Sequence, residues 1–204
     1  ESLTGVPFSL VDNDGASTGE RRVVFLNPPL LDKEKGERRS LLTEGALVFA
    51  NLVSQGVRTI AFAKSRKSAE LIYRYAADRL GVDGARRISP YRAGSTPRER
   101  REIEGRLFRG DLLGVVSTNA LELGVDVGAL DAVVCCGYPG SVASIWQQWG
   151  RAGRGKDPAL AVYIAGRDSL DQFLIENPPR VLGRRVEAAR VTMENPYILG
   201  PHLL

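Results

Sequence analysis

Residues 149–157, WGRAGRGKD, hold the spacing of glycine and basic residues on which the fold assignment turns. The letters fit the pattern G-x-x-x-x-G-K of a phosphate-binding P-loop, which a Ser or Thr that holds magnesium should follow. Asp157 stands at that position instead. A P-loop also has to follow a buried strand and run into a helix. Residues 141–149, SVASIWQQW, have a helical pattern, and Asp157-Pro158 leads into an apolar run, so the sequence argues against a P-loop.

The chain around this stretch alternates apolar runs of strand length with helical patterns. The runs are apolar throughout rather than at every second position, which is typical of strands in a parallel sheet that helices cover on both faces. We predict strands at 23–26, 58–63, 87–89, 112–117, 132–136 and 159–165. We predict helices at 38–53, 68–77, 96–108, 141–149 and 168–175. The fold class that follows is α/β, with a parallel sheet flanked by helices.

The composition fits one domain better than two, because the chain has 204 residues. The excess of 28 Lys and Arg over 24 Asp and Glu is too small to indicate a nucleic-acid partner by itself. Cys135 and Cys136 are adjacent in an apolar run, which favours buried strand residues over a disulfide or a metal site. No apolar run has the length of a membrane span or the pattern of a signal peptide, so we expect a cytoplasmic protein without a membrane partner.

Three segments of the chain resemble motifs of superfamily 2 helicases. They are motif VI, Gln147-x-x-Gly150-Arg151-x-Gly153-Arg154; motif V, residues 118–126, TNALELGVD; and motif IV, Phe62 with Ser65-Arg66. The run from YRAG at 91–94 through NALELG at 119–124 to GYPG at 137–140 is similar to a narrower branch, the bacterial MrfA (YprA) type DNA helicases and their eukaryotic Hrq relatives. The resemblance covers nearly the whole chain and implies the fold of a second RecA-like lobe, of the P-loop NTPase type.

The resemblance also implies a domain organisation. We expect residues 1–36 to be a lead-in from the preceding lobe with one strand, residues 37–167 to be the RecA-like helicase C-terminal lobe, and residues 168–204 to begin a C-terminal extension. The sequence has neither a true Walker A motif nor an acidic Walker B motif. We therefore expect ATP and Mg2+ to be held largely by a first lobe outside this chain, and the chain alone to be inactive. The first lobe, single-stranded DNA and duplex DNA are the expected partners.

The resemblance assigns six residues to the ATP site of the closed motor: Arg154, Arg151, Gln147, Gly150, Gly124 and Asp126. Phosphoryl transfer develops negative charge on phosphate oxygens, and a guanidinium from a neighbouring lobe stabilises that charge. Arg154 is the candidate arginine finger, with Arg151 beside it on the γ-phosphate and Gln147 hydrogen-bonded to the same group. Gly150 would let the backbone approach the facing lobe, Gly124 would have a conformational role, and Asp126 would accept hydrogen bonds from the ribose. The alternatives are surface ion pairs for the two arginines and a turn aspartate at 126.

Four residues are expected to contact the nucleic-acid backbone: Thr118, Arg92, Gly94 and Arg66. Thr118 follows a strand at its carboxyl end, where open α/β sheets form their sites, and its hydroxyl could donate to a phosphate. Such contacts give affinity without sequence specificity, and they weaken with salt. The alternatives are a helix cap for Thr118 and solvated surface arginines for Arg92 and Arg66.

We expect this chain to be the second motor lobe of an ATP-dependent superfamily 2 DNA helicase or translocase. Closure of the cleft would bring the arginines onto ATP, and hydrolysis would reopen it, so that alternating grips on the strand produce steps. The resemblance also implies 3′-to-5′ movement, DNA repair and a nucleoid-associated protein of the bacterial cytoplasm. Two alternatives stay open: the lobe of an RNA helicase, which 2′-hydroxyl contacts would mark, and a non-catalytic nucleic-acid-binding module that retains the fold.

Overall fold

The computed structural model describes residues 6–9, 19–92, 94–123, 130–153, 158–183, 186–187 and 195–203. Six strands form one parallel sheet in the order β1-β8-β7-β4-β6-β5. They are β1 (Arg21–Leu26), β4 (Thr59–Ala63), β5 (Ile88–Tyr91), β6 (Gly114–Ser117), β7 (Ala132–Cys136) and β8 (Ala159–Ile164). Two short strands, β2 (Leu30–Asp32) and β3 (Glu37–Arg38), pair separately as an antiparallel hairpin. The predicted α/β class with a parallel sheet is confirmed.

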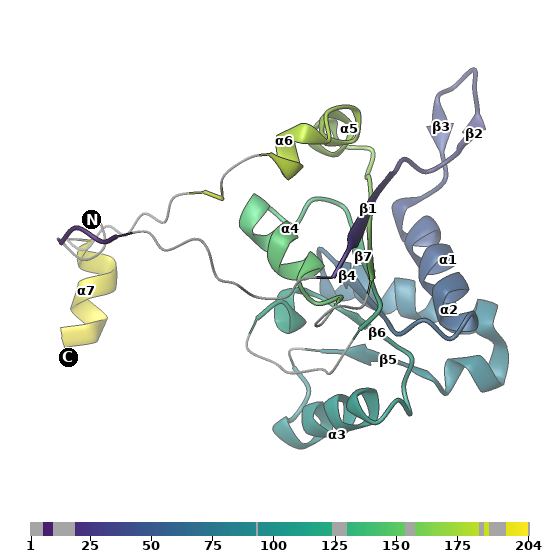
Figure 1. Ribbon diagram of the computed structural model, residues 1–204, viewed down its shortest axis with the longest axis horizontal. Helices are drawn as coiled ribbons and strands as arrows, with labels where there is room; N and C mark the ends of the chain where they lie inside the picture. The colour runs from purple at the N-terminus through teal and green to yellow at the C-terminus, as the bar shows by residue number, and fades with distance from the viewer. Residues whose placement is uncertain are drawn as a thin grey trace.

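Helices cover both faces of this sheet (Figure 1). The helices of the described residues are α1 (Leu41–Ser54), α2 (Arg66–Ala85), α3 (Pro97–Phe108), the 3-10 turn η1 (Asn119–Leu121), α4 (Val142–Trp149), α5 (Ser169–Glu176), α6 (Pro179–Leu182) and α7 (Pro196–Leu203). α1 and α2 pack on one face together with Ala61 and Ala63. α3, α4, α5 and α6 contribute to the core on the other face, together with Ile60 and Phe62. The inner strands therefore place alternate residues in two cores, which explains why their sequences are almost entirely apolar.

The chain changes direction between two central strands of the sheet. β4 and β7 are neighbours, but α2 leads from β4 to β5 on one side and α4 leads from β7 to β8 on the other. The crevice outside the carboxyl ends of two such strands is the usual place for a ligand in an open α/β sheet. A pocket of about 230 Å3 lies there, lined by Phe62, Ala63, Lys64, Asn119, Cys136, Gly137, Tyr138, Pro139, Gly140 and Gln148. The topology therefore indicates a ligand site at this edge of the sheet.

Several segments differ from the sequence-based expectation: the helix expected at 68–77 runs from Arg66 to Ala85, and the strand expected at 87–89 runs from Ile88 to Tyr91. The helix expected at 38–53 starts only at Leu41, because Glu37–Arg38 pair with β2 and Ser40 is the N-cap. Residues 1–36 were expected to contain one strand, but the described part of this range contains β1 and β2. β1 pairs in parallel with β8, so the expected lead-in supplies an edge strand of the lobe's own sheet.

The expectations about thiols and metals concern β7. Cys135 and Cys136 are free thiols there, and both are buried. Burial raises the pKa of both thiols, that of Cys136 to about 12, so both stay neutral at physiological pH.

Among the described residues, no group of three or more His, Cys, Asp or Glu side chains is placed to hold a metal ion. Within the same residues, every helix is too short or too polar to cross a membrane.

Candidate nucleic-acid and nucleotide interface

Three of the residues expected to contact nucleic acid lie around one pocket at the carboxyl edge of the sheet. Arg66 begins α2 just after β4, Arg92 directly follows β5, and Thr118 directly follows β6. Because these strands are parallel, their carboxyl ends meet at the same edge. The pocket has a volume of about 260 Å3 and is lined by Arg66, Lys67, Ala69, Glu70, Pro90, Tyr91, Arg92, Val116 and Thr118. The structure therefore brings together Arg66, Arg92 and Thr118, which are far apart in sequence.

The charged side chains of this pocket are three cations, Arg66, Lys67 and Arg92, and one carboxylate, Glu70. Nη2 of Arg92 lies 2.6 Å from Oε2 of Glu70, and the two side chains are 58% and 37% exposed. Arg66 and Lys67 are exposed. A cationic surplus on an open surface suits a phosphate, since binding to the nucleic-acid backbone is chiefly electrostatic. The sequence did not indicate Glu70, because its partner Arg92 is 22 residues away.

The helix cap that was the alternative for Thr118 is not made through its side chain. Thr118 is the N-cap residue of η1 by position, but its hydroxyl makes no capping hydrogen bond. The side chain is half-buried at the pocket wall. Gly94, in contrast, is exposed in the turn before α3 and does not line this pocket. Its assignment to the nucleic-acid site stays a prediction.

The second group of expected residues lies at the end of α4. Ser141 caps the start of this helix, since its side chain accepts a hydrogen bond from the backbone N–H of Ser144. Ile145 and Trp149 are fully buried in the core, and the Trp149 ring meets that of Trp146 edge-on at a centroid distance of 5.3 Å. These apolar anchors leave Gln147 exposed on the opposite face of the helix. Its expected contact with ATP stays a prediction.

The helix ends where the motif VI resemblance places its glycines. Gly150 is the C-cap of α4 with φ −64°, a value that any residue can adopt, so its own backbone conformation does not require glycine. Gly153 has φ +81°, in the region that favours glycine, and its N–H donates to the carbonyl of Leu130 over 2.9 Å. A helix therefore precedes this segment, and β8 follows it at Ala159, so the context of a P-loop is absent.

Arg151 is held against the segment that resembles motif V. Its Nε and Nη2 both donate to the main-chain carbonyl of Glu122, over 3.1 Å and 2.6 Å. The side chain is half-buried. Whether Arg151 also acts on ATP stays a prediction. Of the residues assigned to the ATP site, Arg154, Gly124 and Asp126 lie outside the described residues, and their roles stay predictions.

Glu122 is the functional candidate that sequence reasoning missed. The residue is only 6% exposed. Its Oε1 accepts a hydrogen bond from the Ser144 hydroxyl over 2.6 Å, and its Oε2 accepts one from Nε2 of Gln148 over 3.0 Å. Ser144 and Gln148 are four residues apart and so lie on one face of α4. A carboxylate in an otherwise apolar stretch was the available signal, but the donors are 22 and 26 residues away.

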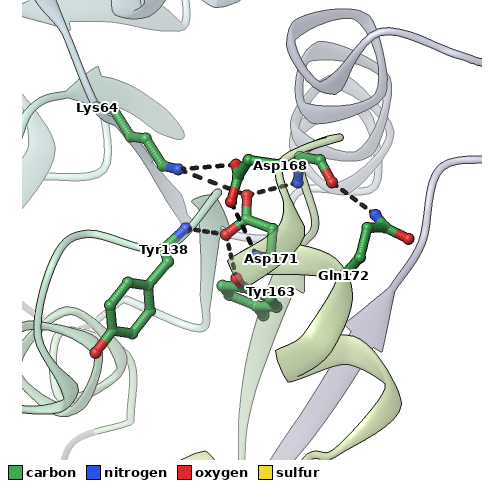
Figure 2. A network of polar contacts seen from close by, with 7 residues as sticks. Lys64, Tyr138, Tyr163, Asp168, Asp171 and Gln172 are labelled. Carbon is green, nitrogen blue, oxygen red and sulfur yellow. Dashed lines mark hydrogen bonds and ion pairs between the residues drawn. The ribbon is translucent and has the colours of Figure 1, made fainter.

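A second polar network fixes the sheet edge beside the pocket of Lys64 (Figure 2). The Asp171 side chain is fully buried and lies 3.5 Å from Nζ of Lys64. It accepts hydrogen bonds from the Tyr163 hydroxyl over 2.7 Å and from the backbone N–H groups of Tyr138 over 2.8 Å and Gly166 over 2.7 Å. Burial and the hydrogen bond to Asp171 raise the pKa of Tyr163 well above its usual range, so the phenol stays protonated and donating.

The same network anchors the start of α5. Asp168 is its N-cap, and the side chain accepts a hydrogen bond from the Asp171 N–H over 2.9 Å. That hydrogen bond, assisted by the nearby Lys64 ammonium, lowers the pKa of Asp168. Gly137 has φ +79°, and a Cβ there would lie 2.5 Å from Cε of Lys64, so glycine lets the lysine stem cross the loop after β7. Lys64 and Asp171 therefore hold the start of α5 against the loop after β7.

Comparison with known proteins gives a family match over most of the sheet. The family described as "Helicase conserved C-terminal domain" matches residues 41–156. The chain is 46% identical over 204 residues to "Uncharacterized ATP-dependent helicase YprA" of Bacillus subtilis, covering 100% of this chain and 27% of that protein. It is 36% identical over 202 residues to "ATP-dependent helicase hrq1" of Schizosaccharomyces pombe, covering 96% of this chain and 19% of that protein.

The solved structures that match this chain include helicases bound to DNA. A crystal structure of the DUF1998 helicase MrfA bound to DNA matches with a TM-score of 0.90 and 45% identity, over 99% of this chain and 27% of that one. The helicase Lhr of Mycobacterium smegmatis, bound to single-stranded DNA and AMP-PNP, matches with a TM-score of 0.74 and 27% identity, over 92% of this chain and 25% of that one. The chain thus spans about a quarter of these helicases. The resemblance to the MrfA (YprA) and Hrq branch, and the RecA-like fold, are confirmed.

Proposed function

The chain belongs to the family of helicase conserved C-terminal domains, and from this premise we propose that it is the second motor lobe of an ATP-dependent DNA helicase. Its relatives are named ATP-dependent helicases, but the chain spans about a quarter of the length of YprA. The ATP-driven activity is therefore proposed for the longer protein, with the other half of the motor supplied by a first RecA-like lobe. DNA, and that first lobe, are the proposed partners.

One observation carries the proposal most directly: the candidate strand site and the candidate ATP residue are joined through a single short segment. Thr118 stands in the pocket with Arg66 and Arg92, and η1 follows it at once. Glu122, the next residue after η1, accepts two hydrogen bonds from Arg151 through its carbonyl. A motor lobe needs such a link, because ATP hydrolysis has to change the grip on the strand.

On the nucleic-acid side, Arg66, Arg92 and Thr118 bind successive phosphates of a single strand. The two guanidinium groups supply charge, and the threonine hydroxyl supplies a hydrogen-bond donor. Because these groups contact phosphates rather than base edges, the lobe grips the strand regardless of sequence, as a motor must. Gly94, in the turn after Arg92, belongs to the same proposed surface.

On the nucleotide side, closure of the interlobe cleft carries Arg151 and Arg154 to the γ-phosphate. ATP supplies the phosphoanhydride bond and the first lobe holds Mg2+, while this chain supplies positive charge as negative charge develops on the transferred group. Gln147, exposed at the end of α4, hydrogen-bonds the same phosphate, and Gly150 admits the facing backbone. Asp126 accepts hydrogen bonds from the ribose, and Gly124 has a conformational role, as the resemblance implies. Arg151 has to leave the Glu122 carbonyl in this step.

DNA is proposed over RNA because the matched MrfA and Lhr structures are described as bound to DNA or single-stranded DNA. A role in DNA repair is part of the same proposal and rests on the branch resemblance alone. A lobe of an RNA helicase is the second candidate, since "S. cerevisiae Dbp5 bound to RNA and ADP BeF3" has the same fold at 18% identity and a TM-score of 0.60.

The test is strand separation by the full-length parent protein. DNA and RNA duplexes of the same sequence, each with a single-stranded tail, are offered with ATP and with a non-hydrolysable analogue. We expect the DNA duplex to be unwound with ATP only. Unwinding of the RNA duplex in preference to DNA would favour the second candidate, and binding without ATP-dependent unwinding or translocation of either would favour a non-catalytic module.

A further inference from the structure

The side chain of Glu122 makes contacts that the proposed roles of Thr118, Arg151 and Arg154 do not use. Its carboxylate is buried, where an ionised group costs free energy unless hydrogen bonds satisfy it. Ser144 and Gln148 supply those hydrogen bonds over 2.6 Å and 3.0 Å. Its carbonyl supplies the acceptor for Arg151. One residue is therefore bound to α4 through its side chain and to the residue after α4 through its main chain.

The segment that carries Glu122 is short, and it is held by a main-chain hydrogen bond and by a buried leucine. The N–H of Glu122 donates to the carbonyl of Asn119 over 3.0 Å, which closes the single turn of η1. Leu121 is fully buried in the core beneath it. A displacement of Thr118 at the start of this turn therefore moves the carboxylate and carbonyl of Glu122 together rather than being absorbed by a loose loop.

We propose that Glu122 is a positioning residue that transmits strand binding at Thr118 to Arg151, through its hydrogen bonds to Ser144 and Gln148 of α4. This inference rests on the proposed function. The carboxylate links the turn of η1 to α4, so a shift of that turn is passed to the backbone from which Arg151 extends. The carbonyl gives the guanidinium a defined resting place, from which it is released when a bound strand shifts the turn. Glu122 touches neither ATP nor DNA in this scheme.

The contact between Glu122 and Gln148 can be tested by exchanging its two side chains in the full-length parent protein. Gln148→Glu sets two carboxylates against each other in a buried site, where two like charges are strongly unfavourable. Glu122→Gln with Gln148→Glu restores one amide and one carboxylate with the hydrogen bond reversed. Gln55→Glu introduces the same change of charge at an exposed residue at the end of α1 and is the matched control.

The readout is the ATPase turnover with and without a single-stranded DNA of mixed sequence, together with the KM for ATP. We expect Gln148→Glu to lower the stimulation by DNA about tenfold, within the ~5–150-fold range of coupling between sites. DNA-free turnover and the KM for ATP should stay close to the wild-type values. The exchanged pair should recover most of the stimulation, and Gln55→Glu should behave as the wild type.

Three results would overturn the proposal for Glu122. They are wild-type stimulation in Gln148→Glu, an exchanged pair no better than Gln148→Glu, and an equal fall of turnover with and without DNA, which is the sign of a merely structural role. Glu122→Ala, checked for folding by its thermal transition, should repeat the loss of stimulation. A wild type without DNA-stimulated ATPase would instead contradict the proposed function, so the two failures are distinguishable.

Discussion

At the scale of the residue, the arginines of the candidate interface differ in how they are held. Arg92 is largely exposed and paired with Glu70, whereas the guanidinium of Arg151 is half-buried on a main-chain carbonyl. An exposed ion pair contributes little to stability and exchanges readily for a phosphate. A half-buried guanidinium that donates two hydrogen bonds to one carbonyl has a defined position before the cleft closes. The two arginines are therefore suited to different tasks, adaptable strand contact and directed ATP contact.

Replacing Arg92 should weaken strand binding without changing its sequence preference. Arg92→Ala removes one phosphate contact, so the slope of log affinity against log salt concentration for single-stranded DNA should become shallower by ~0.7. Binding of the full-length protein, measured by fluorescence anisotropy over a salt series and with several sequences, checks this. Arg109→Ala is the matched control, because Arg109 is also an exposed arginine in an ion pair, 3.0 Å from Asp111. An unchanged slope for Arg92→Ala would remove Arg92 from the strand site.

Asp171 joins α5 to the loops that follow β7 and β8. Its buried carboxylate accepts from two backbone N–H groups and the Tyr163 hydroxyl, so Asp171→Asn would turn an amide N–H2 towards a donor. Leaving such buried groups unpaired should cost about 2 kcal/mol or more of unfolding free energy. Urea unfolding of the 204-residue chain measures this loss of unfolding free energy. Asp111→Asn, at an exposed carboxylate, should change it by less than about 0.5 kcal/mol, and equal effects of the two substitutions would contradict the assignment.

At the scale of the element, periodicity predicted those parts that local sequence determines. Residues 132–136 were predicted as a strand and form β7 with the same bounds, because both faces of the strand are buried and every residue is apolar. Helix α1 starts later than predicted, because Glu37 and Arg38 pair with β2, a tertiary contact that helical spacing does not reveal. The Glu122 contacts were missed for the same reason, since they join elements that are remote in sequence.

The N-cap of α3, Thr96, gives a test at this scale. Thr96 accepts a hydrogen bond from the Glu99 N–H over 3.2 Å, and the Glu99 side chain accepts one from the Thr96 N–H over 2.7 Å. Thr96→Ala should cost about 1 kcal/mol of unfolding free energy, and Thr96→Ser should retain most of it. Urea unfolding compares the two. Equal losses in both variants would show that packing, rather than the cap, stabilises this end of the helix.

At the scale of the whole molecule, the fold brings together at one edge of the sheet residues that the sequence distributes from position 66 to position 118. Arg66, Arg92 and Thr118 were chosen from the resemblance to helicase motifs, and parallel strand order explains why they meet. Glu70, which pairs with Arg92, and Glu122, whose carbonyl accepts from Arg151, were not predictable, because a lone sequence does not reveal contacts between elements that are remote in sequence. The sequence thus indicated the groups that would bind phosphates, and the structure added the groups that orient them.

The central claim is that this lobe delivers Arg151 to ATP when a strand is bound. Its most direct test is the DNA-stimulated ATPase of the full-length protein with Arg151→Ala, at saturating DNA and with ATP binding measured in parallel. We expect turnover to fall by ~10²–10³ while ATP and DNA binding are largely retained, because the guanidinium acts on charge that develops in the transition state. Near-normal turnover would contradict the claim and leave Arg151 as a structural link between α4 and the segment that carries Glu122.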